Sequence, residues 1–218
     1  MRAVIVANGD AVPGDRSIAA AAGMLIAADG GAHLCSRWGL LPQLVVGDLD
    51  SLVAEHAEEL ARLGVRVVAY PTAKDESDTE IAVRHALESG AGEIVLLAAL
   101  GGDRLDHELA NLLLVADPRV RGRLRAVRGR TTVRALHGGD QLGLDGSPGD
   151  IVTLLPLGDA AGVVTEGLRY PLDREPLRAG AARGLSNVVD RAGATVALAA
   201  GVLIVIEIAD GGSGGWNI

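Results

Sequence analysis

The segment with the clearest chemical meaning is Val46-Gly47-Asp48-Leu49-Asp50-Ser51, in which two acidic residues follow a short apolar run. In an extended chain, residues two apart point to the same side, so Asp48 and Asp50 are expected to face the same space. Adjacent carboxylates repel each other unless a cation shares their site, and carboxylates with substrate phosphates are usual ligands of Mg²⁺. The spacing therefore indicates a Mg²⁺ site, and the alternative is an Asp-rich turn that caps the next helix.

Similar polar segments follow five apolar runs in the first half of the chain, at residues 3–7, 24–28, 44–46, 65–70 and 94–100. These runs are rich in Val, Ile and Leu without polar alternation, which is typical of strands covered on both faces. Helical patterns lie between them, so we expect a parallel sheet with right-handed crossovers. One such pattern is an apolar stripe predicted to face the sheet, formed by Leu105, Leu109, Leu112, Leu113 and Ala116.

The polar segments at the ends of these runs favour one shared site. Ligands of open parallel sheets bind beyond the carboxyl ends of the strands, where all five segments are expected to meet. They contain acids, glycines and two cations, Lys74 and Arg104, and their sequences are Asn8-Gly9-Asp10, Asp29-Gly30-Gly31, Gly47–Ser51, Pro71–Asp78 and Gly101–His107. Cations can contact phosphate directly, while the acids need a metal between them and phosphate. This set of residues predicts phosphoryl transfer, which depends mainly on positioning and charge neutralisation.

The second half of the chain has a different pattern, with short strand candidates at residues 124–127, 131–136, 151–156, 162–165, 188–189, 195–199 and 202–208. Turn sequences separate them, which is typical of an antiparallel sandwich. We therefore predict an α/β fold followed by an all-β fold. A Rossmann-like parallel-sheet domain is expected at residues 1–120, a β-sandwich at 121–210 and a Gly/Ser-rich tail at 211–218.

Composition excludes several functions. The chain of 218 residues has 28 acidic against 20 basic side chains and no Phe, which argues against nucleic-acid binding. No apolar run approaches the ~18 residues of a membrane span. Cys35 is the single cysteine, so we expect no intrachain disulfide, a small core side chain at this position and a cytoplasmic protein. A P-loop motif is absent, and so is a Gly-x-Gly-x-x-Gly after the first strand.

Four ordered motifs resemble those of the thiamine pyrophosphokinase family: Asp29-Gly30-Gly31, Gly47-Asp48-Leu49-Asp50-Ser51, Lys74-Asp75-x-x-Asp78 and Gly101-Gly102-x-Arg104-x-Asp106-His107. Gly184-Leu185-Ser186-Asn187 is similar to the motif of that family's second domain, so the resemblance spans nearly the whole chain. It implies transfer of a pyrophosphoryl group from ATP to the hydroxyl of thiamine, which gives thiamine diphosphate and AMP.

The resemblance also implies roles for residues of the first domain. Asp48, Asp50 and Asp78 would hold Mg²⁺, while Lys74 would lie near the transferred phosphates or the attacking hydroxyl, with Asp75 beside it in the catalytic set. Arg104 would contact an ATP phosphate, with support from Asp106 and, without itself touching the substrate, from His107. The nucleotide site would be lined by Asn8, Asp29, Gly30 and Gly31. Ser51 would either cap the next helix or contact a metal-bound water.

In the second domain the resemblance implies that Ser186 and Asn187 reach thiamine across the interface of a homodimer. Val188 and Val189 follow this pair where some family members have an aromatic residue. Three alternatives are a pyrophosphokinase acting on another alcohol such as a hydroxymethyl pterin, a non-catalytic nucleotide or thiamine sensor, and a dehydrogenase. The acidic residues with Lys74 argue against a sensor, and the missing glycine fingerprint argues against a dehydrogenase.

Overall fold

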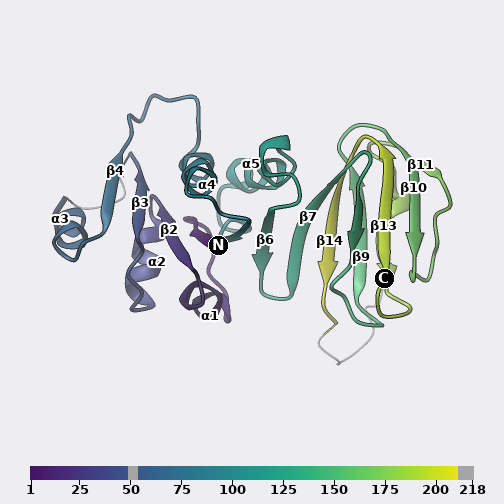
Figure 1. Ribbon diagram of the computed structural model, residues 1–218, viewed down its shortest axis with the longest axis horizontal. Coiled ribbons are helices and arrows are strands. Elements are labelled where there is room, and N and C mark those ends of the chain that lie inside the picture. The colour runs from purple at the N-terminus through teal and green to yellow at the C-terminus, as the bar shows by residue number, and fades with distance from the viewer. Residues whose placement is uncertain (49–53, 211–218) are drawn as a thin grey trace. The chain divides into compact units, whose positions relative to one another are not determined.

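The computed structural model describes residues 1–48 and 54–210, and the chain divides into two compact units. The first unit comprises Met1–Leu114 and Arg123–Gly129, and the second comprises Val115–Gly122 and the chain from Arg130 onward. Helices and strands alternate in the first unit, whereas strands predominate in the second (Figure 1). The described helices include none that is long and apolar enough to cross a membrane.

The first unit is built on a parallel sheet whose strands lie in the order β6-β5-β1-β2-β3-β4. Its strands are β1 (Arg2–Val6), β2 (Met24–Ala28), β3 (Leu44–Gly47), β4 (Arg66–Ala69), β5 (Glu93–Leu97) and β6 (Leu124–Arg128). Its helices are α1 (Asp15–Ala20), α2 (Gly31–Arg37), α3 (Ala54–Arg62), α4 (Asp78–Glu88) and α5 (Leu105–Val115). The predicted parallel α/β fold and its five strands are confirmed: β1, β2, β3 and β5 are buried along most of their length, whereas β4 lies at the edge of the sheet and is partly exposed.

The strand β6 differs from the sequence prediction, which grouped residues 124–127 with the strands of the second half. It pairs in parallel with β5, with Leu124 opposite Ile94 and Ala126 opposite Leu96. The prediction was wrong because the sequence of a short strand does not indicate which sheet the strand belongs to. The burial of β6 alternates along the strand, a pattern that periodicity alone assigns equally well to a sandwich.

Helix α5 also differs from prediction, because its leucine stripe does not face the sheet. Leu105, Leu109 and Leu113 are 66%, 51% and 57% exposed. The buried side of the helix carries Asn111 and Val115 instead, and the Asn111 side chain donates to the Ala99 carbonyl at 2.9 Å. The first turns of α5 line a pocket through polar side chains, so the helix is rotated away from the orientation that its leucines suggest.

The second unit contains two antiparallel sheets, in the orders β12-β9-β14-β7 and β11-β10-β13-β8. Their strands are β7 (Thr131–His137), β8 (Gln141–Gly143), β9 (Ile151–Pro156), β10 (Ala160–Glu166), β11 (Glu175–Leu177), β12 (Asn187–Val188), β13 (Thr195–Ala200) and β14 (Val202–Ile208). Two short 3-10 helices, η1 (Pro118–Val120) and η2 (Ala182–Gly184), also belong to this unit. One apolar core joins side chains from both sheets, such as Leu154 and Leu203 with Val163 and Val196. The predicted sandwich is therefore confirmed.

The core of the first unit contains Cys35, which is fully buried on α2, as the sequence predicted. Desolvation by this burial raises the pKa of the thiol to about 12. Helix α2 packs closely because Gly31 has no side chain. A Cβ at this position would lie 2.0 Å from the Val6 carbonyl oxygen of β1.

The buried thiol makes stability depend on pH. The Cys35 thiol stays protonated in the folded chain and ionises in the unfolded chain above pH ~8.5, so rising pH favours unfolding. We expect the free energy of unfolding to fall by about 2 kcal/mol more in the native chain than in Cys35→Ala between pH ~8 and ~10. Urea denaturation of both proteins across this range measures the difference. Parallel pH curves would contradict the prediction.

Candidate active site

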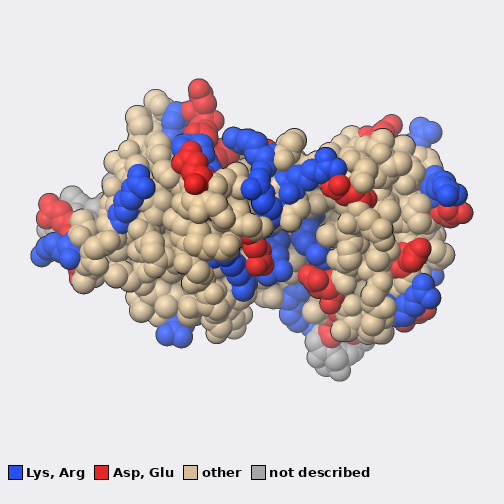
Figure 2. All heavy atoms as spheres, viewed as in Figure 1, with Lys and Arg blue, Asp and Glu red and all other residues tan. Residues whose placement is uncertain are grey.

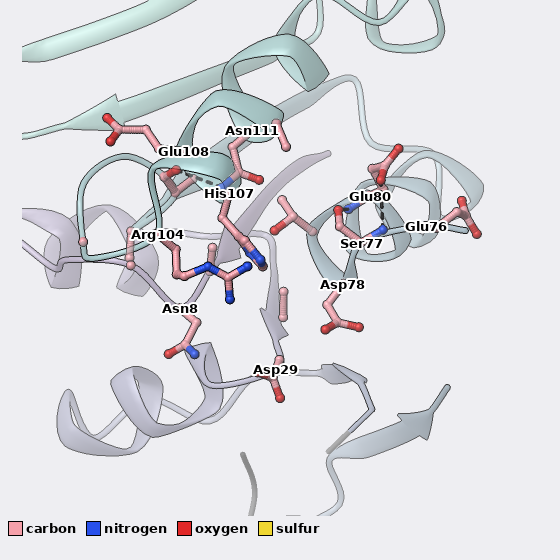
Figure 3. Close-up of a pocket in the computed structure, with 18 of the residues that line it drawn as sticks. Asn8, Asp29, Glu76, Ser77, Asp78, Glu80, Arg104, His107, Glu108 and Asn111 are labelled. Atoms are coloured by element: carbon pink, nitrogen blue, oxygen red, sulfur yellow. Dashed lines mark hydrogen bonds between the residues drawn. The ribbon is translucent and has the colours of Figure 1, made fainter. Parts of the chain in front are cut away.

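A pocket of about 690 Å³ opens in the first unit beyond the carboxyl ends of β1, β2 and β5. It is lined by segments that follow these strands, by the β4–α4 loop and by the first turns of α4 and α5. Figure 3 shows side chains from these elements converging, with Asp29 and Asp78 directed into the same space. The pocket lies where the sequence predicted a shared site.

Three carboxylates meet at this pocket: ligand atoms of Asp29, Asp48 and Asp78 lie within 4.8 Å of one another. Burial is the main cause that raises the pKa of Asp78 above its usual value, the Lys74 ammonium opposes this shift, and the charges of Asp29 and Asp48 add to it. Such a cluster is mutually repulsive, and a divalent cation with oxygen ligands relieves that repulsion. The donor set therefore fits Mg²⁺.

Asp29 belongs to this acidic cluster, although the sequence placed it in the nucleotide site. Its backbone N–H donates to the Val46 carbonyl at 2.7 Å, because β2 and β3 are neighbours in register. The same register brings Asp29 close to Asp48. Had the sequence analysis placed these two strands side by side in the sheet, it would have predicted that the two carboxylates meet. Asp29 also has a φ of 47°, an uncommon backbone conformation for a residue other than glycine. The predicted site residues Asp50 and Ser51 lie outside the described residues.

Lys74 is the cation beside the acidic cluster. Its Nζ lies 3.2 Å from Asp78 Oδ1 and donates to the Pro71 carbonyl at 3.2 Å, and its side chain is only 15% exposed. Asp78 Oδ1 is buried and makes no hydrogen bond of good geometry among the described residues. Lys74 therefore offsets part of the acidic charge, while an oxygen of Asp78 keeps capacity for a ligand. Asp75 is exposed and also lines the pocket.

Asp78 is placed by the N-terminal cap of α4. The Ser77 hydroxyl accepts from the Glu80 N–H at 3.2 Å, and the Glu80 carboxylate accepts from the Ser77 N–H at 2.9 Å. This capping box fixes where the helix begins, so Asp78 occupies its first position. A carboxylate in the first turn is also favoured by the helix dipole.

Arg104 and Asp106 lie at the start of α5. The Arg104 guanidinium donates two hydrogen bonds to the Asp106 carboxylate, at 2.9 and 2.7 Å, and both side chains are about two-thirds exposed. These hydrogen bonds hold the pKa of Asp106 well below its usual value. Arg104 lines the pocket together with His107, and Figure 3 shows both side chains reaching into it. Asp106 thus orients Arg104.

Three residues that were predicted to line the nucleotide site pack closely against their neighbours: Asn8, Gly30 and Gly31. Asn8 lines the pocket, and its side chain lies where a Cβ of Gly30 would have to be, 2.2 Å from Asn8 Oδ1. Gly31 allows the contact with β1 described above. Gly9 has no room for a side chain either, since its Cβ would lie 2.6 Å from the Ala98 carbonyl oxygen. These glycines let the pocket wall form from closely packed backbone.

Ser186 and Asn187 lie in the second unit, where the amide of Asn187 makes three hydrogen bonds. Its Oδ1 accepts from the N–H groups of Tyr170 and Val188 at 3.0 and 2.9 Å, and its Nδ2 donates to the Tyr170 carbonyl at 2.7 Å. Ser186 is exposed, with a φ of 54°. Tyr170 is held by this buried amide and is 56% exposed, and the sequence analysis did not identify it.

Known proteins resemble the chain along most of its length. A model described as "Thiamin pyrophosphokinase, catalytic domain" matches residues 16–125, and one described as "Thiamin pyrophosphokinase, vitamin B1 binding domain" matches residues 141–203. A Bacillus subtilis protein named thiamine pyrophosphokinase is 24% identical over 79% of this chain and 81% of its own length.

Solved structures share the fold. The crystal structure of a thiamin pyrophosphokinase from Geobacillus thermodenitrificans has 26% identity and a TM-score of 0.82, and the match covers 97% of this chain and 99% of that chain. A structure described as a thiamin pyrophosphokinase family protein, from Enterococcus faecalis, has 24% identity and a TM-score of 0.83, with coverage of 96% and 100%.

The acidic cluster predicts a metal-dependent gain in stability. Asp29→Asn removes one charged ligand, and Asn tolerates the left-handed backbone at this position. We expect Mg²⁺ to raise the Tm of this variant by less than about half of the rise in the native chain, because fewer carboxylates share the cation. Differential scanning fluorimetry with and without Mg²⁺ measures this.

The matched control is Asp173→Asn, an 88% exposed side chain of the second unit. It should keep the full rise in Tm. An undiminished rise in Asp29→Asn would remove Asp29 from the metal site.

Proposed function

The chain belongs to the thiamin pyrophosphokinase family, and we propose how its residues carry out ATP-dependent pyrophosphoryl transfer to thiamine. The observation that carries the proposal is the acidic cluster of Asp29, Asp48 and Asp78, of which Asp29 and Asp78 line the same pocket as Lys74. This combination of carboxylates and a cation suits a polyphosphate with its divalent metal. Asp50 and Ser51 stay part of the proposed site on the sequence motif alone.

The proposed reaction is an attack by the thiamine hydroxyl oxygen on the β-phosphorus of ATP, with AMP as the leaving group. Mg²⁺ held by the acidic cluster would neutralise charge on the phosphates. Lys74, which lies next to Asp78, would bind the transferred phosphates. Arg104, whose guanidinium is held by Asp106, would bind another phosphate oxygen of ATP. The chain therefore contributes mainly orientation and electrostatic stabilisation.

For thiamine we propose a site around Ser186 in the second unit. The exposed hydroxyl of Ser186 can pair with a ring nitrogen or amine, and the exposed ring of Tyr170 offers a flat apolar surface. Asn187 would act by holding the backbone of Tyr170, since its own amide is engaged. Gly184 supports the same segment, because a Cβ there would lie 2.1 Å from the Leu154 carbonyl oxygen.

We further propose a cytoplasmic homodimer in which each thiamine site takes residues from both chains. Exposed apolar side chains support this assembly, because α5 presents Leu105, Leu109 and Leu113, and Leu185 next to Ser186 is 49% exposed. Contiguous exposed leucines on a helix are typical of a surface that another protein covers. A two-fold axis would give two equal sites.

The proposed chemistry predicts products and a requirement for Lys74. ATP, Mg²⁺ and thiamine should yield AMP and thiamine diphosphate, and chelation of Mg²⁺ should abolish turnover reversibly. Lys74→Met should lower kcat by ~10²-fold or more, because a charged contact with the transferred group is lost. Chromatographic separation of nucleotides and thiamine esters measures both. ADP with thiamine monophosphate, or turnover of a hydroxymethyl pterin instead, would overturn the proposed reaction.

Shared sites predict complementation between two inactive chains. An Asp78→Asn chain mixed with a Ser186→Ala/Tyr170→Ala chain should regain about a quarter of native activity, since half of the dimers are mixed and one of their two sites is intact. Each variant alone is the control, and subunit exchange is verified with two affinity tags. Absence of recovery after exchange would place the whole site within one chain.

A further inference from the structure

The β4–α4 loop, residues 70–77, carries Lys74 and leads directly into Asp78. Its first residue, Tyr70, donates its N–H to the Gly47 carbonyl at 2.8 Å. Beyond this point most of the loop is exposed up to Asp75. An exposed loop that must hold a charged group within ångströms of a phosphate needs fixing by other means.

Arg84 of α4 contacts both ends of this loop. Its guanidinium donates to the two carboxylate oxygens of Glu76, at 3.4 and 3.2 Å, and its Cζ lies 5.9 Å from the centre of the Tyr70 ring. The hydrogen bonds with Glu76 hold the pKa of Arg84 above its usual value. Both charged side chains are about one-third exposed, so their pairing is partly shielded from solvent.

His85 provides a further contact with the start of the loop. The Tyr70 hydroxyl lies 2.9 Å from His85 Nε2, and the two rings meet edge to face with centres 6.3 Å apart. The His85 side chain is only 12% exposed, and desolvation lowers its pKa, which favours the neutral ring. Tyr70 is therefore held between two consecutive residues of α4.

The carboxylate of Glu76 does not take part in the acidic cluster. Figure 3 shows it directed away from Asp29 and Asp78. Acidic and basic side chains lie beside one another over the loop and α4 on the face shown in Figure 2. Glu76 therefore lines the pocket together with Lys74 and Asp78 of the same segment, but its carboxylate is paired with Arg84.

We propose that Glu76 and Arg84 are positioning residues for the transfer, acting through a brace that fixes the loop bearing Lys74. The brace consists of Tyr70, Glu76, Arg84 and His85. It closes the loop against α4, whose first residue is Asp78, so Lys74 and Asp78 keep a fixed separation. The inference rests on the proposed roles of Lys74 and Asp78.

The test compares variants of the brace with a matched control. Glu76→Gln and Arg84→Met should each lower kcat about tenfold with little change in the KM for thiamine. A displaced Lys74 charge stabilises the transition state less well, whereas the binding of thiamine does not depend on it. The double variant should be no worse than either single variant, since both remove one interaction. Arg84→Lys should recover part of the loss.

Glu88→Gln is the control, because Glu88 is the other acidic partner of Arg84, at 3.5 Å, and lies outside the loop. It should leave kcat unchanged. Amide hydrogen exchange of residues 71–77 gives a readout independent of activity: exchange should quicken in Glu76→Gln and Arg84→Met, with Tm nearly constant.

The outcomes separate the inference from the proposed site. A loss of kcat in Glu76→Gln with normal Arg84→Met would assign Glu76 a direct contact with substrate and overturn the brace. Normal kcat in both variants, with Lys74→Met impaired, would also overturn the brace but leave the site intact. Normal kcat in Lys74→Met would overturn both.

Discussion

Repulsion among three carboxylates is the constraint on which the rest of the active-site structure depends. Neighbouring parallel strands place Asp29 and Asp48 side by side, and the start of α4 adds Asp78. Three negative charges within a few ångströms are unfavourable without a partner, and the raised pKa of Asp78 reflects this together with burial. Lys74 relieves part of the repulsion from inside the chain. A divalent cation shared by these carboxylates would relieve the repulsion and stabilise the folded chain.

Rigid surroundings hold the charged groups in place. Backbone packs directly on backbone where Gly9 meets Ala98 and where Gly31 meets Val6, so the ends of the strands have little freedom to move apart. The capping box of α4 fixes its first residue in the same way. Functional side chains carried by such elements keep their geometry better than those on free loops. Lys74 is the exception, because it lies on a loop.

Sequence patterns predicted much of this structure, and their failures have physical causes. The strands at 24–28, 151–156 and 202–208 were predicted to the residue, because long apolar runs between turns leave few alternatives. β8 and β11 were missed, since three residues are too few to show a period. Motif spacing located the pocket but not the partners of each side chain. The amide of Asn187 bonds the backbone of Tyr170, a contact between distant segments that no local pattern encodes.

The interleaved path of the chain has a consequence for biosynthesis. The parallel sheet is completed by β6, which follows the Val115–Gly122 segment of the second unit. A nascent chain that has emerged only as far as α5 therefore presents β5 with one edge unpaired, and an open strand edge invites pairing with other chains. The edge of β5 is covered only after β6, which follows α5 in the sequence, has left the ribosome. The parallel sheet of the first unit therefore cannot be completed before part of the second unit has been synthesised.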